Sequence, residues 1–253
     1  MRIGHLWPIL IFEVHIIINF SGLRDVTRRY LLLFFGLALM SLGIALSIHS
    51  DLGTTPISSV PATLNLITGW SVGTWLILIN LVFVGLEILL LRRRFPPIQL
   101  LQIPVVLVFG LFNDAALWLV RDVEPGNYLQ QWGLVAAGIL VVGVGVAYQV
   151  KAKATPLAGE GLILTISNEL IRAFGPKKPF LFGNVKVTFD TTLVVIAAVL
   201  GLIFLGNLGG VREGTVAAAL LVGVVAQATL RLISPKKTPD NAETQVRDEK
   251  DPE

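Results

Sequence analysis

Several charged and polar residues of this chain lie inside long apolar stretches, where they are costly unless they pair or face a cavity. Lys186 and Asp190 are four residues apart, which places them on one helix face and allows them to form an ion pair. Asp114, beside Asn113, lies too deep in its apolar stretch for the headgroup layer. The pattern indicates a solute path or buried pairs, and it leaves both interpretations open for Lys186 and Asp190.

Two Thr-Pro steps add a second chemical feature, because each predicts the start of a short helix. Thr55 suits the N-cap position and Pro56 the first helical position, and the same applies to Thr155 and Pro156. If such a helix dips into the membrane, the free N–H groups at its start attract a carboxylate or another anion. The alternative is a capped interfacial helix without a ligand. Pro61 predicts a kink or an early end of the first short helix.

The remaining polar groups are weaker candidates, with one exception. Glu160 lies one turn into the second short helix and has no obvious partner nearby in sequence. Glu87 lies one turn before the Arg92–Arg94 cluster and is interpreted mainly as interfacial. Neutral amides inside the apolar stretches often tie helices together, and these are Asn80, Gln102 and Gln149. The predicted substrate-binding residues are Thr54, Thr55, Ser58, Asn80, Asp114, Thr155, Glu160, Lys186 and Asp190.

Enzyme chemistry is not indicated by these residues. The chain has no cysteine, and its three histidines form no pair with the spacing of metal ligands. It also lacks a Ser/His/Asp set, HExxH, a P-loop and a dinucleotide-binding fingerprint, and Asp114 and Asp190 lack the motifs that flank paired catalytic aspartates. We therefore expect no enzyme activity, no metal and no cofactor.

Long apolar stretches supply the elements that must position these residues. Hydrophobic residues make up 54% of the chain and charged residues 15%, against roughly 25% charged in soluble domains. A helix needs about 20 mostly apolar residues to cross a bilayer. The six stretches that qualify are Tyr30–His49, Val72–Leu91, Ile98–Val120, Trp132–Val150, Val185–Leu205 and Thr215–Ile233. The sequence thus predicts an all-α membrane protein with six transmembrane helices in contact with the lipid bilayer.

Basic residues predict the orientation of these spans. Two shorter segments, Pro56–Ile67 and Pro156–Ile171, could each be spanning, interfacial or re-entrant. If both crossed the membrane, the Arg92–Arg94 cluster would move to the outer face together with Lys151 and Lys153, against the positive-inside rule. We therefore expect six spans in a bacterial inner membrane, with both termini cytoplasmic. Because the basic residues sit at the ends of apolar stretches, they do not indicate a nucleic-acid partner.

The two halves of the chain resemble one another, and each reads as span, Thr-Pro segment, span, span. Chance similarity between glycine-spaced apolar segments is the alternative. Since each unit has an odd number of spans, the repeats must be inverted, an arrangement that recurs among secondary transporters with the substrate near the midplane. The matched positions are Gly36 with Gly138, Gly43 with Gly145, Thr55 with Thr155, Gly73 with Gly183, Asn80 with Asp190, Gly110 with Gly223, and Asp114 with Gln227.

This repeat divides the chain into four parts. Residues 26–122 form the first repeat and residues 123–233 the second. Residues 1–25 are either an interfacial helix or the product of a start assigned too far upstream, since Val26 precedes a conventional basic lead into the first span. Residues 234–253 are polar and charged, which predicts a disordered cytoplasmic tail.

Several motifs occur in the same order in a known family, and from about Thr27 to Ile233 the chain resembles the bacterial YczE/YyaS/YitT membrane proteins, closest to the YczE-like branch. The carrying segments are Gly43 to Leu46, Asp51 to Ile57, Leu100 to Pro104, Phe109 to Asp114, Gly159 to Gly161, Gly183 to Asp190 and Val211 to Thr215. The resemblance implies an inner-membrane protein with a role in transport, and it adds little about the substrate.

Three functions remain open at this point. The first is a secondary transporter of a small polar, anionic or zwitterionic solute, working by alternating access, in which Glu160 or Asp114 carries a coupling proton. The second is the substrate-binding membrane subunit of an energy-coupling-factor-like transporter, which would need partner transporter subunits. The third is a non-transporting assembly or resistance factor. A homodimer is a further expected partner arrangement.

Overall fold

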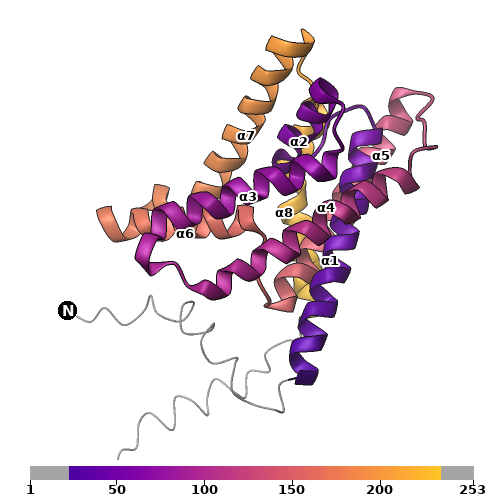
Figure 1. Ribbon diagram of the computed structural model, residues 1–253. Helices are drawn as coiled ribbons and strands as arrows, with labels where there is room; N and C mark the ends of the chain where they lie inside the picture. Colours follow the sequence, from indigo (N-terminus) through magenta and orange to yellow (C-terminus); the bar gives the residue numbers. More distant parts are fainter. Residues whose placement is uncertain (1–22, 235–253) are drawn as a thin grey trace, which may run out of the picture.

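The computed structural model describes residues 23–234, which form six long helices and two short ones (Figure 1). The predictions for residues 1–22 and 235–253 lie outside this part of the chain, and residues 23–25 belong to the first helix. The long helices are α1 (Leu23–His49), α3 (Val72–Leu91), α4 (Gln102–Leu119), α5 (Tyr128–Ala152), α7 (Phe182–Leu205) and α8 (Glu213–Ile233). The short ones are α2 (Pro56–Thr68) and α6 (Ala158–Phe174), and three single 3-10 turns are η3 (Arg92–Arg94), η4 (Pro97–Leu101) and η5 (Lys178–Phe180).

The six predicted spans are confirmed. Each coincides with a helix that is long and apolar enough to cross a membrane, and α2 and α6 are not among these helices. With 13 residues at about 1.5 Å rise each, α2 extends about 20 Å, well short of a hydrocarbon core about 30 Å thick. The helix continues through Pro61 to Thr68, so the predicted early end is wrong.

Glycines bring α1 and α5 into close contact at the centre of the bundle. A Cβ atom at Gly36 would lie 2.7 Å from the carbonyl oxygen of Gly145, and one at Gly43 would lie 2.7 Å from that of Gly138. Only glycine permits this approach, as at other membrane helix crossings. Since Gly36 meets the later glycine of α5 and Gly43 the earlier one, the two helices run in opposite directions.

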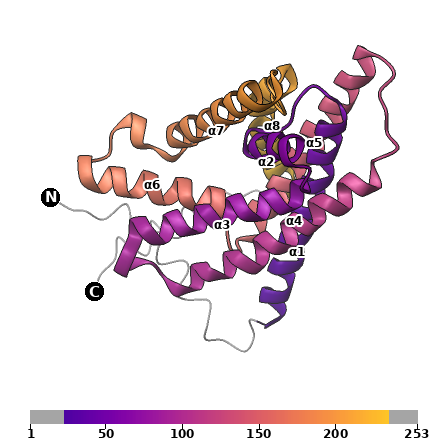
Figure 2. The same cartoon turned by 45° about the horizontal axis from the view of Figure 1, so that its top comes forward.

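The other helices arrange themselves around this pair. Helix α4 packs on α1, and α8 packs on α5. Because α2 follows the end of α1 and α6 follows the end of α5, the two short helices lie at opposite ends of the molecule (Figures 1 and 2). Helices α3 and α7 each contact both α2 and α6. The short helices therefore tie the second span of each half, α3 or α7, to the other half.

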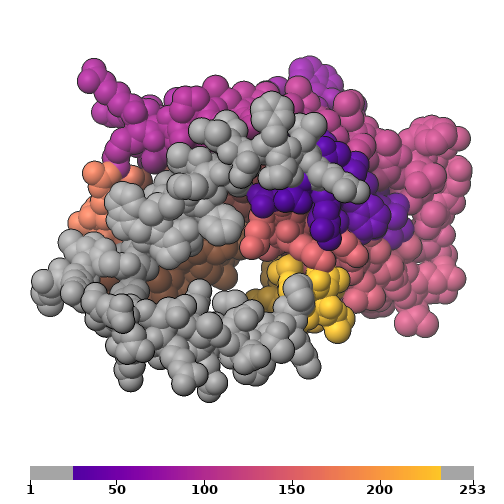
Figure 3. Space-filling view, turned by 90° about the horizontal axis from the view of Figure 1, so that it is seen from below, coloured from indigo at the N-terminus to yellow at the C-terminus, as the bar shows by residue number. Residues whose placement is uncertain are grey.

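Apolar side chains cover the outside of the spans. On α7 and α8 large residues such as Ile203 and Leu220 are more than 60% exposed, as expected for surfaces that face lipid. The start of α1 and the end of α8 lie on the same face of the molecule, seen from below in Figure 3. At that end the Lys151 ammonium donates to the carbonyl of Ile233 at 2.8 Å, which joins the ends of α5 and α8.

Candidate functional site

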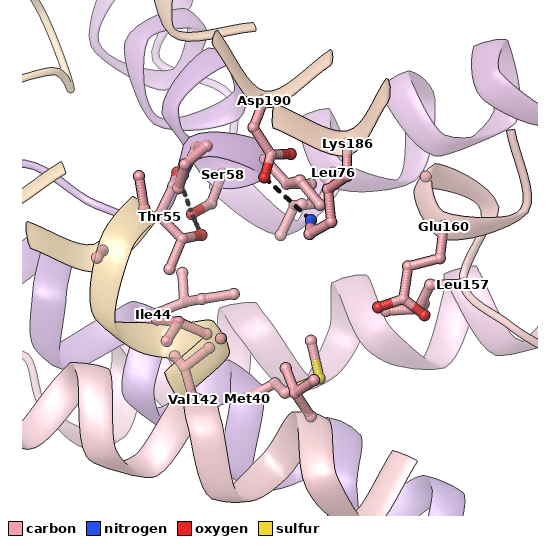
Figure 4. A pocket seen from close by; sticks show the side chains of 18 of the residues that line it. Met40, Ile44, Thr55, Ser58, Leu76, Val142, Leu157, Glu160, Lys186 and Asp190 are labelled. Atoms are coloured by element: carbon pink, nitrogen blue, oxygen red, sulfur yellow. Dashed lines mark hydrogen bonds and ion pairs between the residues drawn. The ribbon is translucent and has the colours of Figure 1, made fainter. Parts of the chain in front are cut away.

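A cavity of about 170 Å³ lies between the two halves, and all eight helices or the segments that lead into them contribute to its wall (Figure 4). Its apolar wall includes Met40, Ile44 and Val142 from α1 and α5. Six of the nine predicted site residues line it: Thr55, Ser58, Asn80, Glu160, Lys186 and Asp190. The structure thus brings together polar side chains from α2, α3, α6 and α7 that are far apart in sequence.

Lys186 and Asp190 form the ion pair that their spacing predicts. The Lys186 Nζ lies 3.0 Å from Asp190 Oδ2 on one face of α7. The Lys186 side chain is 38% exposed and that of Asp190 18%. The other carboxylate oxygen of Asp190 is buried and has no hydrogen-bond partner among residues 23–234. A single contact therefore compensates the Asp190 charge.

Hydroxyl groups at the start of α2 form a second polar side of the cavity. Thr55 occupies the N-cap position as predicted, but its side chain caps no backbone N–H. Its Oγ1 instead lies 2.5 Å from Ser58 Oγ, and Thr54 Oγ1 lies 2.9 Å from the same oxygen. Thr54 is buried behind Ser58 and does not line the cavity. The Ser58 hydroxyl also donates to the Thr55 carbonyl oxygen at 3.2 Å, and Thr55 and Ser58 lie on the cavity wall.

Two cavity residues come from α3 and α6. Asn80 is buried and donates to the carbonyl of Leu76 one turn earlier at 2.8 Å. Glu160 lies in the first turn of α6, and its Oε2 accepts a hydrogen bond from Gln149 Nε2 of α5 at 2.9 Å. Glu160 thus finds in a neighbouring helix the partner that the local sequence did not reveal.

The predicted start of α6 at Thr155 is wrong. The backbone remains extended through Leu157, which is the actual N-cap residue, and the helix begins at Ala158. The buried Leu157 side chain packs into the core beside Met40, so the chain enters the bundle before it turns into a helix. The Thr155 hydroxyl lies outside the cavity, 3.4 Å from that of Tyr30.

Asp114 also lies outside the cavity, at the contact between α3 and α4. Its two carboxylate oxygens accept hydrogen bonds from Ser71 Oγ and from the backbone N–H of Gly73, each at 2.7 Å. Ser71 is the N-cap residue of α3 and Gly73 lies in its first turn, so Asp114 holds the start of that helix against α4. Its position gives it a packing role and places it away from the other predicted site residues.

Glu87 and Gln102 form a buried polar pair that the sequence did not reveal. Gln102 Nε2 donates to Glu87 Oε2 at 3.1 Å, and both side chains are fully buried. The interpretation of Glu87 as interfacial is therefore wrong, because the residue faces α6 and the carboxylate lies directly against Gly161. Two features of the sequence could have indicated this pair. They are the polar residue Gln102 at the start of the next span and the glycine at 161, which leaves room for the Glu87 carboxylate.

No group of three or more His, Asp and Glu side chains within residues 23–234 is placed to hold a metal ion.

The fold and the cavity define a helical membrane protein with six spans around a partly polar chamber. Residues 27–231 match the family of unknown function DUF6198, and the chain belongs to that family. It is 26% identical over 208 residues to the uncharacterized protein YyaS of Bacillus subtilis (strain 168), a match that covers 81% of this chain and 94% of that protein. No solved structure matches the chain.

Proposed function

We propose that this protein is a secondary transporter that moves a small polar solute across a bacterial cytoplasmic membrane by alternating access. The observation that carries the proposal is the cavity between the two halves, where α2, α3, α6 and α7 place hydroxyl, amide and charged side chains. Charged groups inside membrane spans are costly and mark solute or ion paths. The YyaS match supports the family resemblance, and we place the chain in the YczE-like branch.

Glycine contacts support the inverted repeat. Gly36 matches Gly138 in sequence, and Gly43 matches Gly145. A two-fold axis between the halves turns the contact between Gly36 and Gly145 into a contact between Gly138 and Gly43, which is the other contact observed. Such reciprocal contacts are typical of a two-fold interface. Chance similarity of apolar sequence gives no reason for this pairing.

The packing of whole helices supports the same symmetry. Exchanging α1–α4 with α5–α8 turns the contact of α1 with α4 into that of α5 with α8. It likewise turns the contact of α2 with α7 into that of α6 with α3, and the contact of α2 with α3 into that of α6 with α7. Transporters built from inverted repeats bind their substrate where the repeats meet, which is the place of this cavity.

One contact departs from the symmetry and suggests how the cavity opens. Helices α3 and α4 pack tightly, because Gly73 and Gly110 each lie against the other's backbone carbonyl. The matched glycines of α7 and α8 are Gly183 and Gly223, and a Cβ atom on either would meet nothing within 4 Å. In our proposal the α3–α4 side is closed and the α7–α8 side open, and the two sides exchange these arrangements during transport.

The proposed orientation follows from the charges at one end of the bundle. Arg29 near the start of α1 and Lys153 at the end of α5 line one pocket there, with Lys151 close by. On the positive-inside rule this end faces the cytoplasm, so both ends of the described chain do so. The same orientation places Arg92–Arg94 inside, where Arg94 forms a salt bridge with Glu169 of α6 at 3.0 Å.

Reconstitution of the purified protein tests the proposal. A thermal-shift screen first identifies a stabilising solute, and uptake of that solute into proteoliposomes under an ion gradient follows. Transport predicts accumulation by wild type and its loss in Glu160→Gln. Binding without accumulation would instead indicate the binding subunit of a multi-component transporter. A cellular phenotype unchanged by neutral substitutions of Glu160 and Asp190 would indicate a non-transporting assembly or resistance factor.

A further inference from the structure

The charges that line the cavity do not cancel. Glu160, Lys186 and Asp190 are the charged side chains in its wall. Lys186 and Asp190 compensate one another at 3.0 Å, whereas Glu160 forms no salt bridge among the described residues and is held by the neutral amide of Gln149. Burial raises the pKa of the Glu160 carboxyl, and the Lys186 charge offsets this only in part. When Glu160 is ionised, as a cation beside it would favour, the three groups carry one net negative charge.

An unpaired hydrogen-bonding group of the cavity wall also favours a ligand that donates hydrogen bonds. Asp190 Oδ1, in the cavity wall, is a buried acceptor without a donor among residues 23–234. A buried acceptor without a donor costs free energy, so the cavity wall at Asp190 favours a ligand that brings an N–H group. Lys186, the cationic group among the described residues of the cavity wall, is already engaged with Asp190.

The start of α6 also disfavours an anion. The N-terminus of a helix attracts negative charge, but here Glu160 lies in the first turn and supplies that charge itself. A solute carboxylate placed there would meet the Glu160 carboxylate at short range. The expectation of an anion at this helix start therefore does not fit the side chains that surround it.

We infer that the solute bound in this cavity carries an ammonium or guanidinium group that pairs with Glu160. The inference rests on the proposed transport function and names the solute class of that same site. Figure 4 shows Glu160 on one side of the cavity, Lys186 and Asp190 on another, and Met40, Ile44 and Val142 across from the ion pair. The apolar part of the solute packs on this last group. A volume of about 170 Å³ restricts it to a small amine or guanidine.

Sets of three probes that share one carbon skeleton but carry a positive charge, no charge or a negative charge test the inference. They are 3-methylbutylamine, 3-methylbutan-1-ol and 3-methylbutanoate, together with the corresponding butyl and benzyl series, added at millimolar concentration to purified full-length protein. The measurement is the saturable rise in unfolding temperature, from which an apparent affinity follows. We expect stabilisation by at least one amine and by neither the alcohol nor the carboxylate of the same body.

Two matched variants assign this effect to the cavity. Glu160→Gln keeps the size of the side chain and removes its charge, so the amine affinity should fall at least about tenfold, as for loss of a charged hydrogen bond. Glu169→Gln is the control, because it makes the same change on the same helix at the Arg94 salt bridge, outside the cavity. It should leave the amine affinity unchanged.

Several outcomes would overturn the inference: carboxylates that stabilise where amines do not, amine stabilisation that persists in Glu160→Gln, or no stabilisation by any amine. Uptake measurements separate this result from the fate of the proposed function. An amine that binds through Glu160 but is not accumulated supports the solute class and contradicts transport. A carboxylate that is accumulated supports transport and contradicts the solute class.

Discussion

Replacing one glycine in each half by alanine probes the asymmetry between the α3–α4 and α7–α8 contacts. At Gly110 the new Cβ would lie 2.7 Å from the Gly73 carbonyl oxygen and against Ile77. Because a backbone atom cannot swing aside, the overpacking cost falls in the upper part of its usual range, about 2–3 kcal/mol. Alanine recovers up to about 1 kcal/mol of helix propensity, which leaves a net loss of about 1–2 kcal/mol.

The matched change Gly223→Ala has the opposite effect on stability. Nothing lies within 4 Å of the new Cβ atom, so only the propensity gain of about 0.5–1 kcal/mol remains. If α7 and α8 must close on Gly223 during transport, the same variant lowers the uptake rate although the protein is more stable. Gly110→Ala should lower both the unfolding temperature and the uptake rate.

Thermal unfolding in detergent and initial uptake rates in proteoliposomes, measured on the same preparations, decide between these effects. Equal unfolding temperatures for Gly110→Ala and wild type would refute the packing argument. Full uptake by Gly223→Ala would refute the proposed closure of α7 on α8, whatever its stability.

Three further changes have clear expected outcomes. Asp114→Ala removes the acceptor for the start of α3 and should cost about 1–3 kcal/mol of unfolding free energy, measured by thermal denaturation, without changing solute affinity. Lys186→Met leaves the partly buried Asp190 without its partner and should destabilise more than the double change Lys186→Met/Asp190→Asn; equal stabilities would show that the pair is solvated. Glu160→Gln should abolish uptake in proteoliposomes while Glu169→Gln retains it, and equal rates for both variants would remove Glu160 from the mechanism.

Hydropathy and helix periodicity predicted most of the fold. A stretch of about 20 apolar residues has few alternatives to a spanning helix in lipid, so all six spans were found. The ion pair of Lys186 and Asp190 was predictable for a similar reason, because a four-residue separation fixes their relative position on any helix. Both inferences depend only on local geometry.

Contacts between distant helices were not predictable in the same way. Asp114 lies deep in its span, as a site residue would, but its partners Ser71 and Gly73 precede it by about forty residues. Glu87 is one turn from the arginine cluster in sequence. It nevertheless faces α6, because the orientation of α3 about its own axis turns this side chain toward Gly161. Thr155 fits an N-cap by residue type, yet burial of Leu157 delays the helix start. In each case packing between helices overrides the local signal.

In our proposal the two halves cross the membrane in opposite directions around one cavity, and single-cysteine labelling tests this arrangement most directly. The native chain has no cysteine, so Trp70→Cys, just before α3, and Leu181→Cys, just before α7, can each be labelled without background. Both positions are at least half exposed. With a membrane-impermeant maleimide on intact cells and inverted vesicles, Trp70→Cys should react only from outside and Leu181→Cys only from the cytoplasmic side. Reaction of both from the same side would contradict the inverted arrangement.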